Sequence, residues 1–323
     1  MIAIDLQISL SELEDFFNSK NWLEPQEKIE NISNPGEGNM NVVLRIKTSE
    51  RSLILKQSRP FVQKYQEIKA PLERIEVEHH FYKAIANKSA QEHFPEIYGY
   101  DPENYLLLMQ DLGNCEDMSR FYNKGPFSDK TLNTLVDILN TIHNQKNLPN
   151  YPLNQELRTL NHQHIFVLPF MEDNGFDLDG IQKGLQDLSI SYKTDNALKK
   201  EIEKLGQLYL SQGETLLHGD FYPGSWMQSE EKIYVIDPEF SFMGFKEFDL
   251  GVMIAHSIMG NMDLKVIGVV IDRYQSGAEL SLVEQVAGVE IMRRLIGLAQ
   301  LPLKRSLKEK DYLLRMAKKM ILR

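Results

Sequence analysis

The sequence predicts an α+β protein with two lobes. The small N-terminal lobe contains a five-stranded antiparallel sheet with one key helix, and the larger C-terminal lobe is mainly helical. Residues 27–57 and 95–112 contain short apolar runs separated by turn residues, as in antiparallel strands, and most later segments repeat apolar residues at helical spacing. A chain of 323 residues is long enough for two such lobes. We place them at 1–111 and 112–323.

Composition narrows the class of protein. With 42% hydrophobic and 25% charged residues, the chain has the composition of an ordinary globular protein. A formal net charge of -10 argues against nucleic acid as a partner, because phosphate backbones are bound by basic surfaces. The single cysteine, Cys115, cannot form an internal disulfide, and no secretory signal or long apolar run opens the chain. We therefore expect a cytoplasmic protein without a membrane partner.

Five strands are predicted in the first lobe. The segments KIENIS, NVVLRIKT and SLILKQ form three antiparallel strands, the last two joined by a turn at 49–51. PEIYGY and YLLLMQDL add two more around the turn at 101–104. The backbone from Gln110 to Leu112 would then be the hinge between the lobes, where an adenine could form hydrogen bonds. Cys115 lies just beyond this hinge and is interpreted as a bystander.

A glycine-containing turn joins the first two strands. The stretch PGEGNMN contains Gly36 and Gly38, and such a turn can lie flat over phosphate groups and offer them backbone N–H groups. Turns of this kind are also common between strands that bind no ligand. The turn therefore indicates a phosphate site only in combination with the lysine that follows.

Lys56 ends an apolar strand, and a surface lysine would be the ordinary interpretation. The helix that follows, with Pro71 in its first turn, places Glu78 on the same apolar stripe as Ile75 and Tyr82. A carboxylate on a buried face is costly unless it is paired. We therefore predict a pair between Lys56 and Glu78, an arrangement that directs an ammonium group at nucleotide phosphates in kinases.

Other helices follow from apolar spacing and capping patterns. Ser11 and Glu14 form a capping-box pattern at the start of an N-terminal amphipathic helix. Residues 146–180, rich in Asn, Pro and Asp, are interpreted as an irregular segment that covers a substrate. The basic C-terminal tail is amphipathic, with a solvated face as the ordinary interpretation and membrane-surface binding as the alternative. Further helices are predicted at 132–143, 181–188, 196–210 and 282–300.

The stretch 216–251 carries the densest group of reactive side chains, including Asp220, Asp237 and Glu239. A strand at 226–228, a polar turn and a returning apolar strand would bring Asp237 back beside Asp220. Pro238 is expected to hold Asp237 extended. The prediction is that three carboxylates converge on one pocket.

Carboxylates that lie close together repel one another unless cations lie between them, so this pocket is predicted to bind a divalent metal, with Mg²⁺ favoured by oxygen ligands. Phosphoryl transfer from a nucleotide uses such a set, with one carboxylate orienting the attacking hydroxyl and others holding Mg²⁺. A metal-dependent hydrolase would use similar ligands. Asp249 is predicted either to cap a helix or to accept backbone N–H groups from the loop around Asp220.

HGDFYPGSW and IDPE resemble the motifs of the aminoglycoside phosphotransferase and choline kinase superfamily, which has a protein-kinase-like fold. The sequence is more narrowly similar to the methylthioribose kinases. Their GxGNxN loop matches residues 36–41, with asparagines at Asn39 and Asn41. Serine at Ser225 stands where most of the superfamily has asparagine, and it matches this narrower family. The segments ER, MQDLG, DPEFSFMGFKEFDLG and IMRRLIGLAQ are also similar to family motifs.

This resemblance implies roles for individual residues. Asp220 would orient or deprotonate the substrate hydroxyl, and Asp237 and Glu239 would hold Mg²⁺ with Ser225 as a weaker neutral ligand. The glycine loop, Lys56 and Glu78 would position the phosphates of ATP. Spacing alone suggests that Arg293 and Arg294 are solvated, whereas the resemblance implies that both reach the substrate.

Family members transfer the γ-phosphate of ATP to the 1-hydroxyl of methylthioribose and are commonly homodimers. We therefore expect ATP and Mg²⁺ as cofactors, a small hydroxyl-bearing substrate as partner and a homodimer.

Some positions depart from the family pattern. Phe221, Tyr222 and Pro223 replace Leu-His-Thr beside Asp220, so Tyr222 is a candidate substrate contact. Gln300 stands where the family has histidine, and the chain is shorter than typical members. Two alternatives remain open. One is an aminoglycoside- or choline-type phosphotransferase, which the acidic net charge mildly favours; the other is a nucleotide-binding module without transferase activity.

Overall fold

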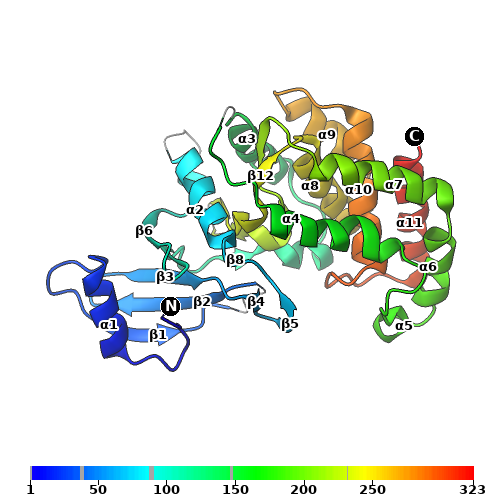
Figure 1. Ribbon diagram of the computed structural model, residues 1–323. Coiled ribbons are helices and arrows are strands. Elements are labelled where there is room, and N and C mark those ends of the chain that lie inside the picture. The colour runs from blue at the N-terminus through cyan, green and yellow to red at the C-terminus, as the bar shows by residue number, and fades with distance from the viewer. Residues whose placement is uncertain (1, 37–39, 87–90, 146–147, 231) are drawn as a thin grey trace.

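The computed structural model describes residues 2–36, 40–86, 91–145, 148–230 and 232–323 (Figure 1). Its main sheet has five antiparallel strands in the order β1-β2-β3-β7-β6. Their bounds are β1 (Ile29–Ser33), β2 (Val42–Thr48), β3 (Ser52–Gln57), β6 (Ile97–Asp101) and β7 (Leu106–Gln110). The predicted five-stranded sheet is therefore confirmed.

Strand β3 is the central strand, and its alternation decides where Lys56 points. Leu53 and Leu55 belong to the core on one face of the sheet. Ile54 packs into the core on the other face. Because successive side chains of a strand point to opposite faces, Lys56 points to the same side as Ile54. This side also holds helix α2 (Arg74–Ile85).

Helix α1 (Leu10–Ser19) covers one face of the sheet through the buried side chains of Leu13 and Phe17. The predicted amphipathic helix is confirmed, but its capping box is made by Ser9 and Glu12 rather than by Ser11 and Glu14. The serine hydroxyl and the glutamate carboxylate each bond the backbone of the other residue, which satisfies two N–H groups at the helix start.

Helix α2 (Arg74–Ile85) lies on the other face of the sheet, toward the helical part of the molecule (Figure 1). It begins three residues after Pro71, which precedes the helix and does not occupy its first turn as predicted. The predicted buried stripe is confirmed, because Ile75, Glu78 and Tyr82 are all buried. Helix α2 therefore presents a carboxylate to the interior of the protein.

The remaining helices surround one continuous hydrophobic core that also includes α2. Within it, α10 packs against both α8 and α11. The bounds are α3 (Asp129–His143), α4 (Gln155–His162), α5 (Leu178–Ile181), α6 (Leu185–Lys193), α7 (Asn196–Leu210), α8 (Glu247–Asn261), α9 (Lys265–Arg273), α10 (Leu280–Ile296) and α11 (Leu307–Ile321).

The segment 146–180 is less irregular than predicted. It contains α4, followed by a π-helical turn, Gln163–Val167. Leu157 and Ile165 are both buried, Ile165 in the main core, and this burial fixes helical structure within a polar stretch. The basic tail also forms a helix, α11, and Leu313 and its apolar neighbours pack against α10.

Short strand pairs complete the fold. The catalytic hairpin consists of β10 (Trp226–Gln228) and β11 (Ile233–Val235), as predicted, and β8 (Glu116–Asp117) pairs with β10. Strands β9 (Thr215–Leu217) and β12 (Phe242–Gly244) form a second pair, and β4 (Phe61–Val62) and β5 (Tyr65–Lys69) a third. The sequence interpretation missed the last two pairs and β8, because these strands are only two to five residues long.

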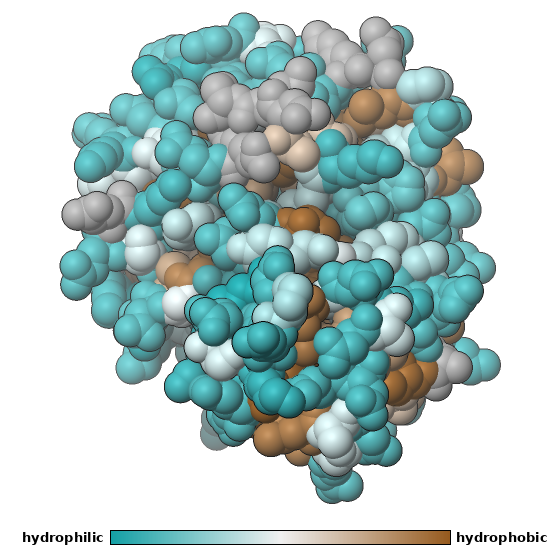
Figure 2. All heavy atoms as spheres, turned by 90° about the vertical axis from the view of Figure 1, so that its left-hand side faces the viewer, coloured by the Kyte–Doolittle hydropathy of each residue, from teal (hydrophilic) through white to brown (hydrophobic). Residues whose placement is uncertain are grey.

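The apolar side chains of the sheet belong to the two hydrophobic cores, one on each face of the sheet. The side of the molecule shown in Figure 2 carries mainly hydrophilic residues with separate hydrophobic spots. Among the helices that the structure describes, none combines the length and the apolar character needed to cross a membrane.

Phe81 should be essential for the attachment of α2. Its fully buried ring lies edge-on to the rings of His218, at 5.7 Å, and Phe94, at 5.9 Å. Phe81→Ala should lower the free energy of unfolding by about 3–5 kcal/mol, because it leaves a cavity in the core. Urea unfolding measures this, with the exposed Lys83→Ala on the same helix as control. Equal stability of the two variants would contradict this role.

Candidate active site

Two strands deliver the predicted acidic residues to the same place. Strand β9 leads into the loop that carries Asp220, and β11 leads into Asp237. The register of β10 and β11 pairs Trp226 with Val235, so the hairpin returns to the point where the loop began. Asp220 and Asp237 consequently line one cavity.

That cavity has a volume of about 560 Å³ and lies between the sheet and the hairpin. It brings together most of the predicted site residues from both parts of the chain. The lining includes Gly36, Asn41, Lys56, Gln110, Leu112, Asp220, Tyr222, Ser225, Asp237 and Glu239. Gly38 and Asn39 lie outside the described residues.

The loop that carries Asp220 is held by Asp249, near the start of α8. The carboxylate of Asp249 accepts the backbone N–H groups of His218, at 2.7 Å, and Gly219, at 3.0 Å. It also accepts a hydrogen bond from His143 Nε2 at 3.1 Å. Gly219 has a φ of 85°, and a Cβ there would lie 2.2 Å from a backbone oxygen of Phe240. Asp249 therefore accepts the loop N–H groups, one of the two predicted roles.

Lys56 forms the predicted pair with Glu78, and it also binds Asp237. Its ammonium lies 2.6 Å from a Glu78 oxygen and 2.7 Å from Asp237 Oδ1. Burial alone would lower the pKa of Lys56, but the carboxylates of Asp237 and Glu78 raise it above its usual value. Lys56 is therefore a fixed positive charge at the floor of the cavity.

Asp237 adopts a left-handed backbone conformation, with φ 61° and ψ 49°, rather than the predicted extended one. The conformation places its carboxylate on Lys56, and the short 3₁₀ turn Pro238–Phe240 follows directly. Left-handed non-glycine residues are uncommon and occur at functional sites. The side chain is 48% exposed, so its carboxylate stays accessible from the cavity.

Glu239 has a different cation. Its Oε2 accepts a hydrogen bond from Asn41 Nδ2 at 2.9 Å and lies 3.3 Å from Arg74 Nε. Arg74 is fully buried and also donates to Asn41 Oδ1 at 2.8 Å. Burial raises the pKa of Glu239, although Lys56 and Arg74 act in the opposite direction. The sequence analysis assigned no role to Arg74. Its position, one residue before the buried stripe of α2, was the signal that could have indicated a buried arginine.

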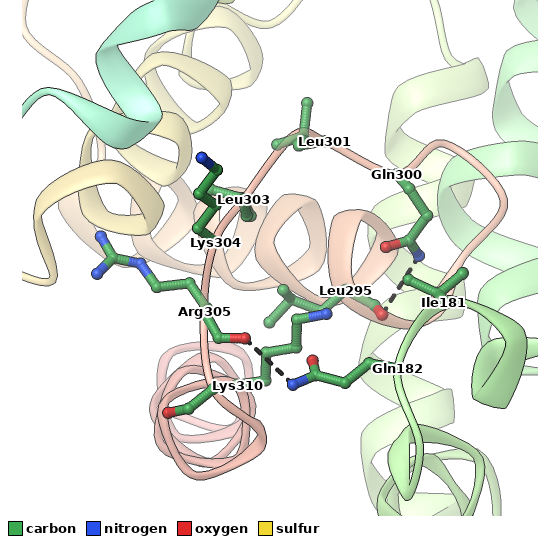
Figure 3. A pocket seen from close by; sticks show the side chains of 10 residues that line it. Ile181, Gln182, Leu295, Gln300, Leu301, Leu303, Lys304, Arg305 and Lys310 are labelled. Atoms are coloured by element: carbon green, nitrogen blue, oxygen red, sulfur yellow. Dashed lines mark hydrogen bonds between the residues drawn. The ribbon is translucent and has the colours of Figure 1, made fainter.

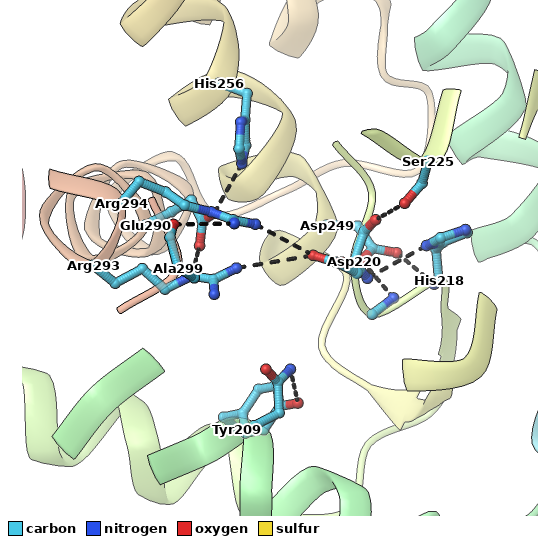
Figure 4. A network of polar contacts seen from close by, with 12 residues as sticks. Tyr209, His218, Asp220, Ser225, Asp249, His256, Glu290, Arg293, Arg294 and Ala299 are labelled. Atoms are coloured by element: carbon cyan, nitrogen blue, oxygen red, sulfur yellow. Dashed lines mark hydrogen bonds and ion pairs between the residues drawn. The ribbon is translucent and has the colours of Figure 1, made fainter. Parts of the chain in front are cut away.

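Asp220 faces two arginines of α10, Arg293 and Arg294 (Figure 4). Their Nη2 atoms lie 3.8 Å and 3.7 Å from Asp220 Oδ1. Both arginines are buried, so the expectation from spacing that they are solvated is wrong. Burial raises the pKa of Asp220 to about 6, although Arg294 and Arg293 act against this rise.

Glu290, to which the sequence analysis assigned no role, forms ion pairs with both arginines (Figure 4). Its Oε1 accepts from Arg294 Nε and from His256 Nε2, each at 2.8 Å, and its Oε2 contacts Arg293 Nε. Burial alone would raise the pKa of Glu290, but the two guanidiniums hold it well below its usual range. A glutamate three and four residues before twin arginines was the signal in the sequence.

His256 links this carboxylate to Tyr122. Because a carboxylate only accepts, His256 Nε2 carries the proton that Glu290 receives, and Nδ1 accepts from the hydroxyl of Tyr122. Burial lowers the pKa of His256 to about 4. The histidine is therefore neutral and structural.

Tyr222 and Ser225 belong to the loop that follows Asp220, and they make different contacts. The Arg294 guanidinium lies 4.8 Å from the ring centre of Tyr222, which also lies 5.1 Å from the ring of His256. Ser225 Oγ donates to the backbone oxygen of Asp220 at 3.0 Å. Tyr222 therefore borders the arginine pair, and Ser225 braces the loop.

Asp220, Asp237 and Glu239 converge on one pocket as predicted, but each of them faces a cation of the protein there. Among the residues that the structure describes, no group of three or more His, Cys, Asp or Glu side chains is arranged to hold a metal. Asp237 Oδ1 binds Lys56, and its partly exposed carboxylate faces the cavity. This donor set fits Mg²⁺, which is commonly bound by one or two carboxylates together with substrate phosphates.

The hinge residues differ in what they offer to a ligand. The N–H of Gln110 donates to the backbone oxygen of Glu96 at 2.8 Å, within the sheet. Leu112 lies past the end of β7 and lines the cavity. Leu112 is therefore the better placed of the two predicted adenine contacts.

Glu290→Gln should lower the free energy of unfolding by about 3–5 kcal/mol, because it leaves two buried guanidiniums without their carboxylate. Glu284→Gln, on the same helix, is the matched control. It removes a pair with the exposed Arg323 at 2.7 Å, which should be worth about 0–1 kcal/mol. Denaturant unfolding of both variants measures the difference, and equal losses would contradict the role of Glu290.

Known proteins share sequence and fold with this chain. The chain is 32% identical to a methylthioribose kinase from Exiguobacterium sibiricum over 233 residues, which is 68% of this chain and 59% of the relative. The chain thus spans about three fifths of the length of the curated relatives that it matches.

Two solved structures share the fold at low identity. Choline kinase LicA from Streptococcus pneumoniae has a TM-score of 0.55 at 14% identity, covering 96% of this chain and 99% of that one. Spectinomycin phosphotransferase APH(9)-Ia, in complex with ADP and spectinomycin, has a TM-score of 0.56 at 14% identity, covering 98% of each chain. The model of the family described as "Phosphotransferase enzyme family" matches residues 31–289. This chain, with its kinase-like fold, therefore belongs to the phosphotransferase enzyme family.

Proposed function

We propose that this protein is an ATP- and Mg²⁺-dependent small-molecule kinase. It transfers the γ-phosphoryl group to a hydroxyl of a sugar, namely the 1-hydroxyl of 5-methylthioribose or of a related ribose. One observation carries the proposal: a buried Lys56, paired with Glu78, lies in the same cavity as Asp220. Similarity to methylthioribose kinases supports the choice of sugar.

The nucleotide would occupy the part of the cavity that the sheet provides. Lys56 supplies the positive charge for the phosphates, and Glu78 and its buried position keep it in place. Gly36 and Asn41 border the phosphate end, and Gln110 and Leu112 border the adenine end. Gly38 and Asn39 are assigned to the same loop by sequence alone.

Mg²⁺ would be held by Asp237, whose accessible carboxylate faces the cavity, together with oxygens of the nucleotide. Glu239 would join it by giving up its pair with Arg74, and Ser225 remains the predicted weaker ligand. When bound, the ion would neutralise charge on the phosphates during transfer.

Asp220 would perform the central step. Its carboxylate accepts the proton of the substrate hydroxyl while that oxygen forms a bond to the γ-phosphorus and the bond to the leaving β-phosphate oxygen breaks. The carboxylate of Asp249 accepts two N–H groups of the loop that carries Asp220. The hydroxyl of Ser225 donates to the backbone oxygen of Asp220, and these bonds hold Asp220 in place. Positioning of this kind is the main contribution that a protein makes to phosphoryl transfer.

The acceptor would bind beside Arg293 and Arg294. Their Nη2 atoms lie 3.8 Å and 3.7 Å from Asp220 Oδ1, which is beyond hydrogen-bond distance. These two nitrogens can therefore donate to hydroxyl oxygens of a sugar. Guanidinium groups repel ammonium groups, which disfavours the aminoglycoside or choline alternative despite the acidic net charge. Tyr222 would form one wall of this subsite.

Three further features belong to this proposal. The lobes are taken as 1–111 and 112–323, with the hinge after β7. The only partner proposed for catalysis is a small hydroxyl-bearing substrate. A homodimer is proposed by analogy with the methylthioribose kinases.

A panel of acceptors tests the activity. With ATP and Mg²⁺, 5-methylthioribose or another ribose should be phosphorylated, and choline and aminoglycosides should not. Asp220→Asn should reduce kcat by about 10²-fold or more while ATP binding is retained, because one transition-state contact is typically worth at least about 3 kcal/mol. Product analysis and nucleotide titration measure these effects. Turnover of Asp220→Asn equal to that of the unmodified protein would refute the assignment.

The pH dependence follows from Asp220. As a proton acceptor it must be ionised, and its pKa is raised to about 6, so kcat/KM should rise with pH and level off above that value. Arg294 lowers this pKa, so Arg294→Met should move the rising limb to higher pH. Rate measurements from pH 5 to 9 would show this; an unchanged limb would contradict the role of Arg294.

A further inference from the structure

The helical part of the chain contains a second cavity, beside the end of α10 (Figure 3). It has a volume of about 380 Å³ and is bordered by the end of α10, by the segment 300–306 and by Gln182 after α5. None of the residues that line it is acidic, and three are cationic: Lys304, Arg305 and Lys310. Arg305 pairs with Glu309 at 3.3 Å and Lys304 is exposed, so Lys310 supplies the positive charge inside the cavity.

Lys310 is the central feature of this cavity. It is only 5% exposed, and its side chain extends into the cavity in Figure 3. Among the described residues, its ammonium forms no ion pair with a carboxylate. Burial lowers the pKa of Lys310, and no acidic group acts against this. An ammonium buried without a counter-charge costs free energy.

The other polar groups of the cavity have mixed roles. The Arg305 guanidinium is directed away, toward the backbone oxygens of Met259 and Gly260. Gln182 Nε2 donates to the backbone oxygen of Arg305 at 3.3 Å. Gln182 Oε1, however, is buried and lacks a hydrogen-bond partner within the described part of the chain. The cavity thus offers one positive charge and one free acceptor.

Lys193 provides a useful contrast. Its ammonium is buried without a hydrogen-bond partner among the residues described, but Lys193 does not line this cavity. Of these two lysines, Lys310 is the one that borders a cavity.

We propose that this cavity binds a small oxyanion, a phosphate- or carboxylate-bearing molecule. Lys310 supplies its charged contact, and Gln182 Oε1 accepts a hydrogen bond from a hydroxyl of the same molecule. The site is distinct from the ATP and acceptor subsites, and it does not depend on the proposed function. It is nevertheless connected to them, because Arg294 Nη1 donates at 3.4 Å to the backbone oxygen of Ala299, just before the segment that borders the cavity.

Thermal unfolding tests the site. The Tm of the full chain is measured in inorganic phosphate, citrate and chloride at equal ionic strength. It should rise with the logarithm of the oxyanion concentration, and chloride should give no such rise. A rise with phosphate alone would identify phosphate groups, and a rise with citrate alone would identify carboxylates; either supports the site. Absence of both rises would overturn it.

Lys310→Met separates this site from phosphate binding in the catalytic cleft, which both proteins share. Without oxyanions, its Tm should equal or exceed that of the unmodified protein, because an unpaired buried charge has been removed. Its oxyanion-dependent rise should shrink to the part contributed by the cleft. Lys310→Arg, which keeps the charge, should retain the full rise.

The exposed Lys308→Met, on the same helix, is the matched control and should behave like the unmodified protein. Equal oxyanion-dependent rises for Lys310→Met and Lys308→Met would overturn the proposal. So would a lower Tm of Lys310→Met in chloride, since this would show that the ammonium has a structural partner.

Discussion

The ion pairs of Lys56 are the interaction on which the rest of the site depends. Its ammonium binds Glu78 of α2 at 2.6 Å and Asp237, after β11, at 2.7 Å. A buried ammonium and a buried carboxylate each require an opposite charge, so the sheet, the helix and the hairpin can pack only if these three side chains meet. The catalytic cavity is the space left beside this junction.

Charge pairing repeats throughout the cleft. Asp237 faces Lys56, Glu239 faces Arg74, and Asp220 faces two arginines. Under the proposed function, the phosphates and metal of a nucleotide would compete for these partners. Repulsion among carboxylates, from which a metal was predicted, is already relieved by the protein's own cations.

A second set of buried carboxylates holds the reactive groups in place without reaching the cavity. Asp249 binds the loop N–H groups beside Asp220, and Glu290 binds the two arginines opposite it. Both come from long helices in the main core, α8 and α10, which pack against each other. Under the proposed function, helix packing would therefore determine the geometry of the acceptor side, and the sheet would determine that of the nucleotide side.

The sequence by itself determined the five strands, the catalytic hairpin, the stripe of α2 and the pair of Lys56 with Glu78. These depend on local periodicity and on the cost of burying a lone charge, which are visible along the chain. Only the tertiary structure decided that Arg74 pairs with Glu239, that the arginines of α10 are buried against Asp220, that Asp237 is left-handed and that Lys310 faces a cavity. The partners in these contacts lie far apart along the chain or face space enclosed by several helices, so no local pattern specifies them.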